Sequence, residues 1–174
     1  MEPLAIYQRV KERFGDRVLE ISESKPDPFC VIDPAAIVEV ATALRDDPET
    51  AMECLSNQSG VDYNDRIEVV YHLFSYRLRH GAVLKVKLPR ENPVVQTLEG
   101  LWKSANWMER EIFDLLGVSF EGHSDLRRIL MPETGPAIHC ARTLSSRSNI
   151  MASQRSARAR SFGSIRNGNE HLSY

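Results

Sequence analysis

Segment 66–88 reads RIEVVYHLFSYRLRHGAVLKVKL and is the most informative part of the chain for its fold. β-Branched and aromatic residues fill its first half, and apolar residues alternate with lysines in its second half. Residues 77–81 have the length of a β-hairpin connection. We therefore predict that 66–76 and 82–88 pair as antiparallel strands. One face of the pair is apolar and the other polar, so helices are expected on one side only.

The residues before this hairpin alternate between helical and extended patterns. Apolar positions at helical spacing predict a helix over 4–14, and two short β-type runs follow at 18–21 and 29–32. Asp33 is an N-cap candidate, with Pro34 at the first position of a second helix.

Three further elements complete the prediction. A strand is expected at 52–56, followed by a turn at 57–60, and a last helical region covers about 94–116 with Gly117 as its left-handed stop. The fold class that follows is α+β, an antiparallel sheet with helices packed on one side.

Composition excludes several classes of protein. The 174 residues carry a formal net charge of -2, and no apolar run is long enough to span a membrane. The first residues lack the basic and apolar regions of a signal peptide, so we expect a cytoplasmic start. The three cysteines are far apart without a CxxC pair, so no thiolate metal site is predicted and the cysteines are expected to be reduced, buried or incidental.

The chain divides into two parts of different chemistry. Residues 1–133 are acidic, whereas residues 134–174 contain six arginines, no lysine, eight serines and one acid, Glu170. We therefore predict a folded domain over 1–133 and a basic, poorly packed, disordered tail over 134–174.

Segment 107–133, WMEREIFDLLGVSFEGHSDLRRILMPE, resembles the signature of the 30-kDa (C) subunit of respiratory complex I, NADH:quinone oxidoreductase. A second segment, VDYNDRIEVVYHLFS at 61–75, is similar to the central strand motif of that family. The residues that carry the signature are Glu109, Arg110, Glu111, Phe113, Asp114, Gly117, His123, Asp125, Leu126, Arg127 and Arg128. The resemblance implies that all of these except Leu126 belong to a subunit interface.

The resemblance implies a non-catalytic structural subunit in the hydrophilic arm of a proton-translocating complex. NADH, FMN, iron–sulfur clusters and quinone would all be bound by partner subunits, and this chain would hold no cofactor, metal or catalytic residue. The implied partners are the quinone-site (D) subunit and the cluster-bearing B and I subunits. The implied location is peripheral, on the cytoplasmic side of the bacterial inner membrane. The signature is shared with membrane-bound hydrogenases, so a subunit of such a hydrogenase is the alternative.

The spacing and type of the motif residues can also be interpreted without the family resemblance. Arg110 and Asp114 are four residues apart and can pair on a solvated helix face, or they can lie half-buried in a network with neighbouring subunits. Arg127 and Arg128 belong either to a surface turn or to a site that docks on an acidic partner. His72 and His123 are expected to be structural, since no nucleophile, base and acid are arranged together.

The tail departs from the family, in which a Pro-Glu pair is usually followed by a segment like DWxGxPLRKDF. One permitted coding string for residues 134–153, read one base earlier, gives DWPGYPLRKDFEFPEQYHGI. We therefore hypothesise that the chain from Thr134 onward results from a one-base frame slip. If the tail is instead genuine, its arginines indicate a nucleic-acid-binding module of a different class, with salt-sensitive binding. A stand-alone hydrolase has no supporting residues.

Overall fold

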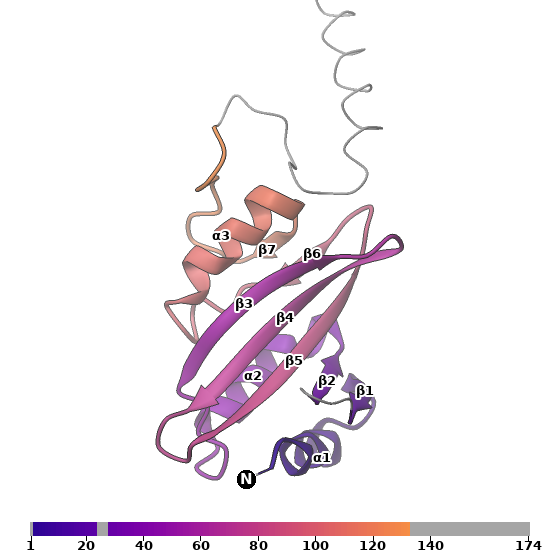
Figure 1. The fold of residues 1–174 in the computed structure, drawn as a ribbon, viewed down its shortest axis with the longest axis vertical. Coiled ribbons are helices and arrows are strands. Elements are labelled where there is room, and N and C mark those ends of the chain that lie inside the picture. The colour runs from indigo at the N-terminus through magenta and orange to yellow at the C-terminus, as the bar shows by residue number, and fades with distance from the viewer. Residues whose placement is uncertain (1, 24–27, 133–174) are drawn as a thin grey trace, which may run out of the picture.

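The structure, a computed structural model, describes residues 2–23 and 28–132, so the predicted tail lies outside the described residues. Two 3-10 turns, at Gly15–Arg17 and Pro34–Ala36, join the regular elements. These elements are α1 (Pro3–Phe14), β1 (Val18–Ser22), β2 (Phe29–Ile32), α2 (Ile37–Asp46), β3 (Cys54–Asp62), β4 (Arg66–Ser75), β5 (His80–Pro89), β6 (Val94–Gln96), α3 (Ala105–Leu116) and β7 (Ser119–Glu121), which are labelled in Figure 1.

The main sheet has five strands in the order β1-β2-β5-β4-β3. The predicted hairpin is confirmed: β4 and β5 are antiparallel, with Tyr71 opposite Leu84. The α+β class is also confirmed, but the sheet is mixed rather than wholly antiparallel, because β2 runs parallel to β5. A parallel neighbour needs a long crossover, and here α2, β3 and β4 supply it.

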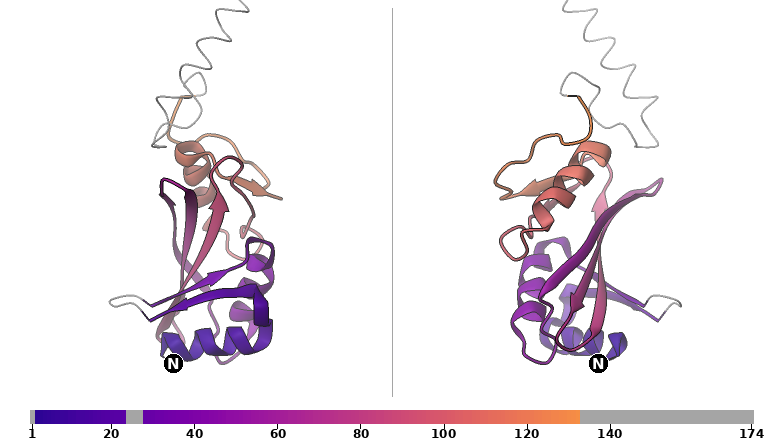
Figure 2. Two further views of the ribbon diagram at one scale, coloured as in Figure 1. Left: turned by 90° about the vertical axis from the view of Figure 1, so that its right-hand side faces the viewer. Right: turned by 60° about the vertical axis from the view of Figure 1, so that its left-hand side comes forward.

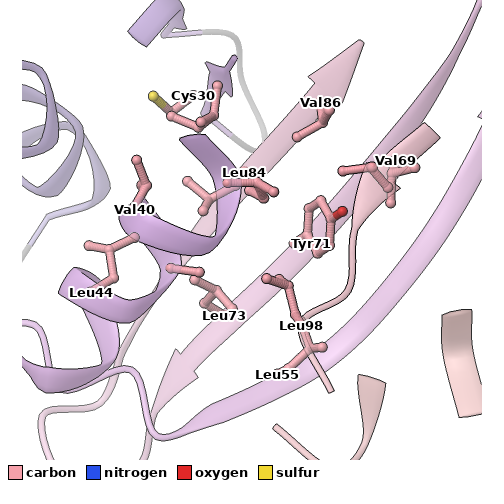
Figure 3. Close-up of a cluster of buried hydrophobic side chains, with 14 of the residues drawn as sticks. Cys30, Val40, Leu44, Leu55, Val69, Tyr71, Leu73, Leu84, Val86 and Leu98 are labelled. Carbon is pink, nitrogen blue, oxygen red and sulfur yellow. The ribbon is translucent and has the colours of Figure 1, made fainter. Parts of the chain in front are cut away.

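All three helices cover the same face of this sheet, as predicted. Figure 3 shows Val40 and Leu44 of α2 packed against strand residues that include Leu73 and Leu84. In Figure 1 the long strands lie in front of α2, and the turned views of Figure 2 place α2 to one side of them. The hydroxyl of buried Tyr7 in α1 donates to the carbonyl of Pro28, the residue before β2 (2.9 Å), and accepts from the amide of Val83 in β5 (2.8 Å).

Strand β3 corrects the prediction of a turn at 57–60. The strand runs through these residues as far as Asp62, and the turn follows at 63–65. Gly60 is needed for close packing instead: a Cβ atom there would overlap the Leu116 side chain and lie 3.1 Å from Cγ2 of Ile112. The glycine therefore marks the place where α3 crosses the strand.

The predicted helical region 94–116 also needs correction at its start. Residues 94–96 form β6, which pairs in parallel with β7, and α3 begins only at Ala105. Leu98 and Trp102 are buried, but they belong to the turn region between β6 and α3 and not to a helix. Their helical spacing was therefore misleading. At the other end Gly117 closes α3 in the left-handed conformation (φ 76°), as predicted.

Candidate functional site

Helix α3 carries three charged residues into the interior. Glu109, Arg110 and Asp114 are 0%, 8% and 2% exposed, so the alternative of a solvated helix face is wrong. Buried charges need hydrogen bonds or counter-charges. All three residues find their partners in loops of this chain.

Asp114 holds the segment that follows β7. Its Oδ2 atom accepts hydrogen bonds from the amides of Ile129 (3.1 Å), Leu130 (2.8 Å) and Met131 (2.8 Å). Its Oδ1 atom lies 3.6 Å from Nε of Arg128. Burial alone would raise the pKa of this carboxyl, but the three amides and the guanidinium outweigh it and lower the pKa below its ordinary value.

Arg110 binds the same segment one turn earlier in α3. Its Nε donates to the carbonyl of Arg127 (3.2 Å) and its guanidinium also reaches the carbonyl of Arg128 (3.5 Å). The guanidinium carbon lies 5.3 Å from the ring centre of Trp107, a cation–π distance. Arg110 and Asp114 therefore act side by side on residues 127–131, rather than as the ion pair that their spacing allowed.

Glu109 faces the opposite way, towards the loop between β6 and α3. Its carboxylate accepts a hydrogen bond from the amide of Leu98 (2.8 Å) and another from the Thr97 hydroxyl. The fully buried ring of His123 places Nε2 4.0 Å from Glu109 Oε2. Burial raises the pKa of Glu109 above its ordinary value, because it outweighs these hydrogen bonds and the interaction with His123.

His123 fastens the loop after β7 to the start of α3. Its Nδ1 atom accepts from the Asp125 amide (3.0 Å), so in the neutral ring the proton lies on Nε2 and is donated to the Asn106 carbonyl (3.1 Å). Glu99 lies 3.5 Å from the same Nε2. Burial opposes ionisation of Glu99, but hydrogen bonds from Asn106 and Ser124 lower its pKa.

The other motif residues divide into exposed and structural positions. Glu111 is exposed and Phe113 half-buried, and the Phe113 carbonyl accepts from the amide of the capping residue Gly117 (2.9 Å). Asp125 and Arg127 form an exposed ion pair of 2.9 Å. Such a pair adds little stability. The Arg127 and Asp125 side chains are 68% and 49% exposed, so both are accessible.

The second family motif lies at the tip of the β3–β4 hairpin and along β4. Arg90, after β5, holds that tip through its bonds to the Asp62 carboxylate and the Tyr63 carbonyl. Arg66 lies over the Tyr63 ring, 4.6 Å from its centre. His72 is half-buried in β4 opposite Val83, the structural position that was predicted for it.

Sequence reasoning missed several residues of this site. Only Trp107 had a usable signal, because a tryptophan three residues before an arginine in a helix lies on the same face, within reach of a cation–π contact. Thr97, Glu99 and Gln58 gave no signal, since they reach α3 only through tertiary packing.

The described residues carry few features of a catalytic centre. They contain no group of three or more His, Cys, Asp or Glu side chains placed to hold a metal ion. Burial raises the pKa of the Cys30 thiol to about 12, so this cysteine is unreactive. Within residues 2–23 and 28–132 no helix is long and apolar enough to cross a membrane.

Two solved structures share the fold of this chain. One is "Nqo5 of the trypsin-resistant fragment (1-134)", at 24% identity and a TM-score of 0.61, over 72% of this chain and 100% of that one. The other comes from the membrane-bound sulfane sulfur reductase, an archaeal respiratory membrane complex, at 18% identity and a TM-score of 0.62, over 98% of both chains. At these identities the likeness concerns the fold alone.

Comparison with the sequences of known proteins shows closer relationships than the fold does. The C subunit of NADH-quinone oxidoreductase from Roseiflexus sp. (strain RS-1) is 43% identical over 76% of this chain and 78% of its own length. Its counterpart from Roseiflexus castenholzii is 46% identical over 74% of this chain and 75% of its own length. The sequence model of the family described as "Respiratory-chain NADH dehydrogenase, 30 Kd subunit" matches residues 30–143. The chain therefore belongs to the family of the 30-kDa subunit of respiratory-chain NADH dehydrogenase.

Proposed function

We propose that this chain is a non-catalytic structural subunit in the hydrophilic arm of a proton-translocating NADH:quinone oxidoreductase. Membership of the 30-kDa subunit family is the observation that carries the proposal. In this role the chain holds no flavin, cluster or quinone, and electron transfer takes place in its partners. Its contribution to activity is then the positioning of those partners.

The chemistry of the buried charges supports a structural role. Arg110 and Asp114 are satisfied by main-chain groups of residues 127–131, so they shape a surface instead of reacting with a substrate. Four exposed residues of α3 and of segment 127–131, two of them large and apolar and two charged, lie near these buried charges. We call these the α3 rim: Trp107, Glu111, Arg127 and Leu130.

The α3 rim has the properties of a docking surface. Trp107 and Leu130 are 64% and 58% exposed although both are large and apolar. The Trp107 ring rests on the Arg110 guanidinium, and the Leu130 amide is tied to Asp114. Rigid aromatic and arginine side chains lose little entropy on binding and dominate many interfaces.

The proposed partner at the α3 rim is the quinone-site (D) subunit, through an acidic surface that pairs with Arg127. Arg128 was expected to share this task, but its side chain lies against Asp114 and donates to the Pro132 carbonyl (2.8 Å). The cluster-bearing B and I subunits would be the further neighbours, and the assembly would lie on the cytoplasmic face of the bacterial inner membrane. The hydrogenase alternative is less favoured, because the two Roseiflexus relatives, at 43% and 46% identity, are subunits of NADH-quinone oxidoreductase.

Co-purification tests this proposal. A tagged full-length chain is expressed in cells that carry the rest of the complex, and the quinone-site and cluster-bearing subunits are quantified in the purified fraction. Trp107→Ala and Arg127→Glu should each reduce recovery of the quinone-site subunit. Lys11→Glu, a matched charge reversal on the exposed face of α1, should leave recovery unchanged. Equal recovery in all three variants would exclude the α3 rim as the docking surface. Failure of both the 174-residue chain and the chain with its frame restored after Glu133 to bring down any oxidoreductase subunit would overturn the proposed function.

A further inference from the structure

Glu109 is an ionisable side chain in an interior position. It is fully buried, and its two hydrogen bonds come from residues 97 and 98. Structural carboxylates in such positions are usually paired with a lysine or arginine. Among the described residues, the ionisable side chain nearest to forming an ion pair with Glu109 is His123, with 4.0 Å between Oε2 and Nε2.

Two polar residues of the sheet also face this carboxyl. Gln58 on β3 and Tyr71 on β4 are opposite each other, and both interact with Glu109. The Tyr71 hydroxyl is buried without a hydrogen-bond partner in the described part of the chain, and the buried side-chain amide of Gln58 interacts with the Glu109 carboxyl so as to lower its pKa. Figure 3 shows Tyr71 among the apolar side chains of the core, near Leu98.

These neighbours suit both charge states of the carboxyl. An amide and a hydroxyl can each donate to a carboxylate, and each can accept from a carboxylic acid. The Thr97 hydroxyl has the same freedom. A buried acid surrounded by groups that reverse their roles can take up or release a proton without leaving a hydrogen bond unmade.

The charges around Glu109 come from three elements. Glu99, from the loop before α3, approaches the shared His123 from the solvent side. On α3 itself, Arg110 is directed away, to the carbonyls of residues 127 and 128. His123, from the loop after β7, uses Nδ1 as an acceptor and Nε2 as a donor, a bonding pattern that fits a neutral ring.

We propose that Glu109 is a proton-operated latch, whose charge state sets how firmly residues 97–99 and 121–125 are held on α3. The protonated form is the closed latch, because a neutral carboxyl avoids the desolvation cost of a buried charge. In the ionised form a negative charge lies in the core, and no lysine or arginine of the described residues is in contact with it, so the two loops open more readily to admit water. Raising the pH therefore loosens both loops.

The latch also controls a surface feature. Residues of both loops line a hollow of about 690 Å³ beside Trp107, among them Thr97, Glu99, Gly122 and Ser124. Loosening the loops changes the shape of this hollow at the edge of the α3 rim. The latch does not depend on the proposed function, because it concerns the folded domain alone.

Amide hydrogen exchange of the full-length chain tests the latch. Exchange of residues 97–99 and 121–125, corrected for the intrinsic dependence on pH, is measured from about pH 5 to pH 8, above the ordinary glutamate range. In the unmodified chain, protection of both loops should fall as the pH rises, and Glu109→Gln should abolish that fall. Glu111→Gln, the same substitution at an exposed site on α3 outside both loops, should retain it.

Two results would overturn the proposal: protection that does not change with pH in the unmodified chain, or an unchanged fall in Glu109→Gln. If Glu109→Gln does not fold, the carboxyl carbon of Glu109 in the unmodified chain is followed by isotope-edited NMR. A titration above the ordinary glutamate pKa that coincides with the loss of protection supports the latch, and a titration at or below that value contradicts it.

Discussion

Gly60 of β3 lies directly beneath Leu116 of α3, and the space that a side chain would occupy at residue 60 is filled by the Leu116 methyl group. This contact fixes how closely the helix approaches the edge strand. Both the motif charges on α3 and the loops that they bind are positioned by it.

Enlarging residue 60 should separate the helix from the sheet. Gly60→Val is expected to reduce the free energy of unfolding by about 1–3 kcal/mol through overpacking, since Ile112 also limits the space. Urea denaturation measures the change. Gly100→Val is the control, because a Cβ at this exposed glycine meets nothing within 4 Å. Equal losses in the two variants would contradict the packing argument.

Removal of the Asp114 carboxylate should release residues 127–131. In Asp114→Ala three amides lose their acceptor, and we expect a loss of about 2–3 kcal/mol because hydrogen bonds to a charged group are stronger than those between neutral groups. Limited trypsin digestion should then cleave after Arg127 and Arg128. Asp125→Ala removes a carboxylate of the same segment from an exposed ion pair and should change neither stability nor cleavage. Resistance of Asp114→Ala to trypsin would show that another contact holds the segment.

Because the pKa of Asp114 is lowered in the folded state, the contribution of its carboxylate to stability depends on pH. A carboxylate whose pKa is lower in the folded state stabilises the fold fully above its ordinary pKa, and this stability is lost as the pH falls through the folded-state value. The midpoint of urea unfolding of the unmodified chain should therefore exceed that of Asp114→Asn at neutral pH. The gap should narrow from about pH 4 downward, as the ordinary aspartate range is passed. A gap independent of pH would refute this linkage.

The Tyr7 hydroxyl should contribute to the free energy of unfolding through two hydrogen bonds. Tyr7→Phe leaves the Val83 amide and the Pro28 carbonyl without this partner, so we expect a loss of about 1–3 kcal/mol. Thermal unfolding provides the measurement. Tyr76→Phe is the matched control, because Tyr76 is 66% exposed, and its hydroxyl has water as an alternative partner. Comparable losses in the two variants would argue against the buried bridge.

The frame-slip hypothesis predicts a defined result at the level of DNA. Resequencing across codons 128–155 should reveal one missing base, and its restoration should give the DWPGYPLRKDF segment after Glu133. The corrected chain should then co-purify with its partner subunits more completely than the 174-residue form. Unaltered DNA together with full assembly of the 174-residue form would exclude the hypothesis.

Local patterns predicted the elements whose partners lie nearby in sequence. The β4–β5 hairpin followed from alternation and a short connection, and Gly117 from its place after the last apolar turn of α3. The parallel pairing of β2 with β5 could not be predicted in this way, because Cys30 and Leu84 meet only through tertiary packing. Gly60 was misassigned because a glycine that permits a turn and a glycine that permits close packing look alike in sequence.

The candidate site was predicted unevenly for a similar reason. The family motif identified Glu109, Arg110 and Asp114, but a helix sequence does not state which loop each side chain reaches. The hydrogen-bond acceptors for Arg110 are main-chain carbonyls, and carbonyls carry no residue-specific signal. Glu99 and Gln58 belong to distant segments, so only the folded chain reveals that they meet α3.

The position of β2 between β1 and β5 imposes an order on folding during synthesis. The ribosome produces the apolar strand β2, whose residues Cys30, Val31 and Ile32 are all buried in the final fold, well before it produces β5. Strands β3, β4 and β5 pair with sequence neighbours and can assemble quickly. Strand β2 has to wait for them with an edge and an apolar face uncovered, a state prone to aggregation. The N-terminal third of the chain is thus completed only after β5 has been made, although it is the first part to leave the ribosome.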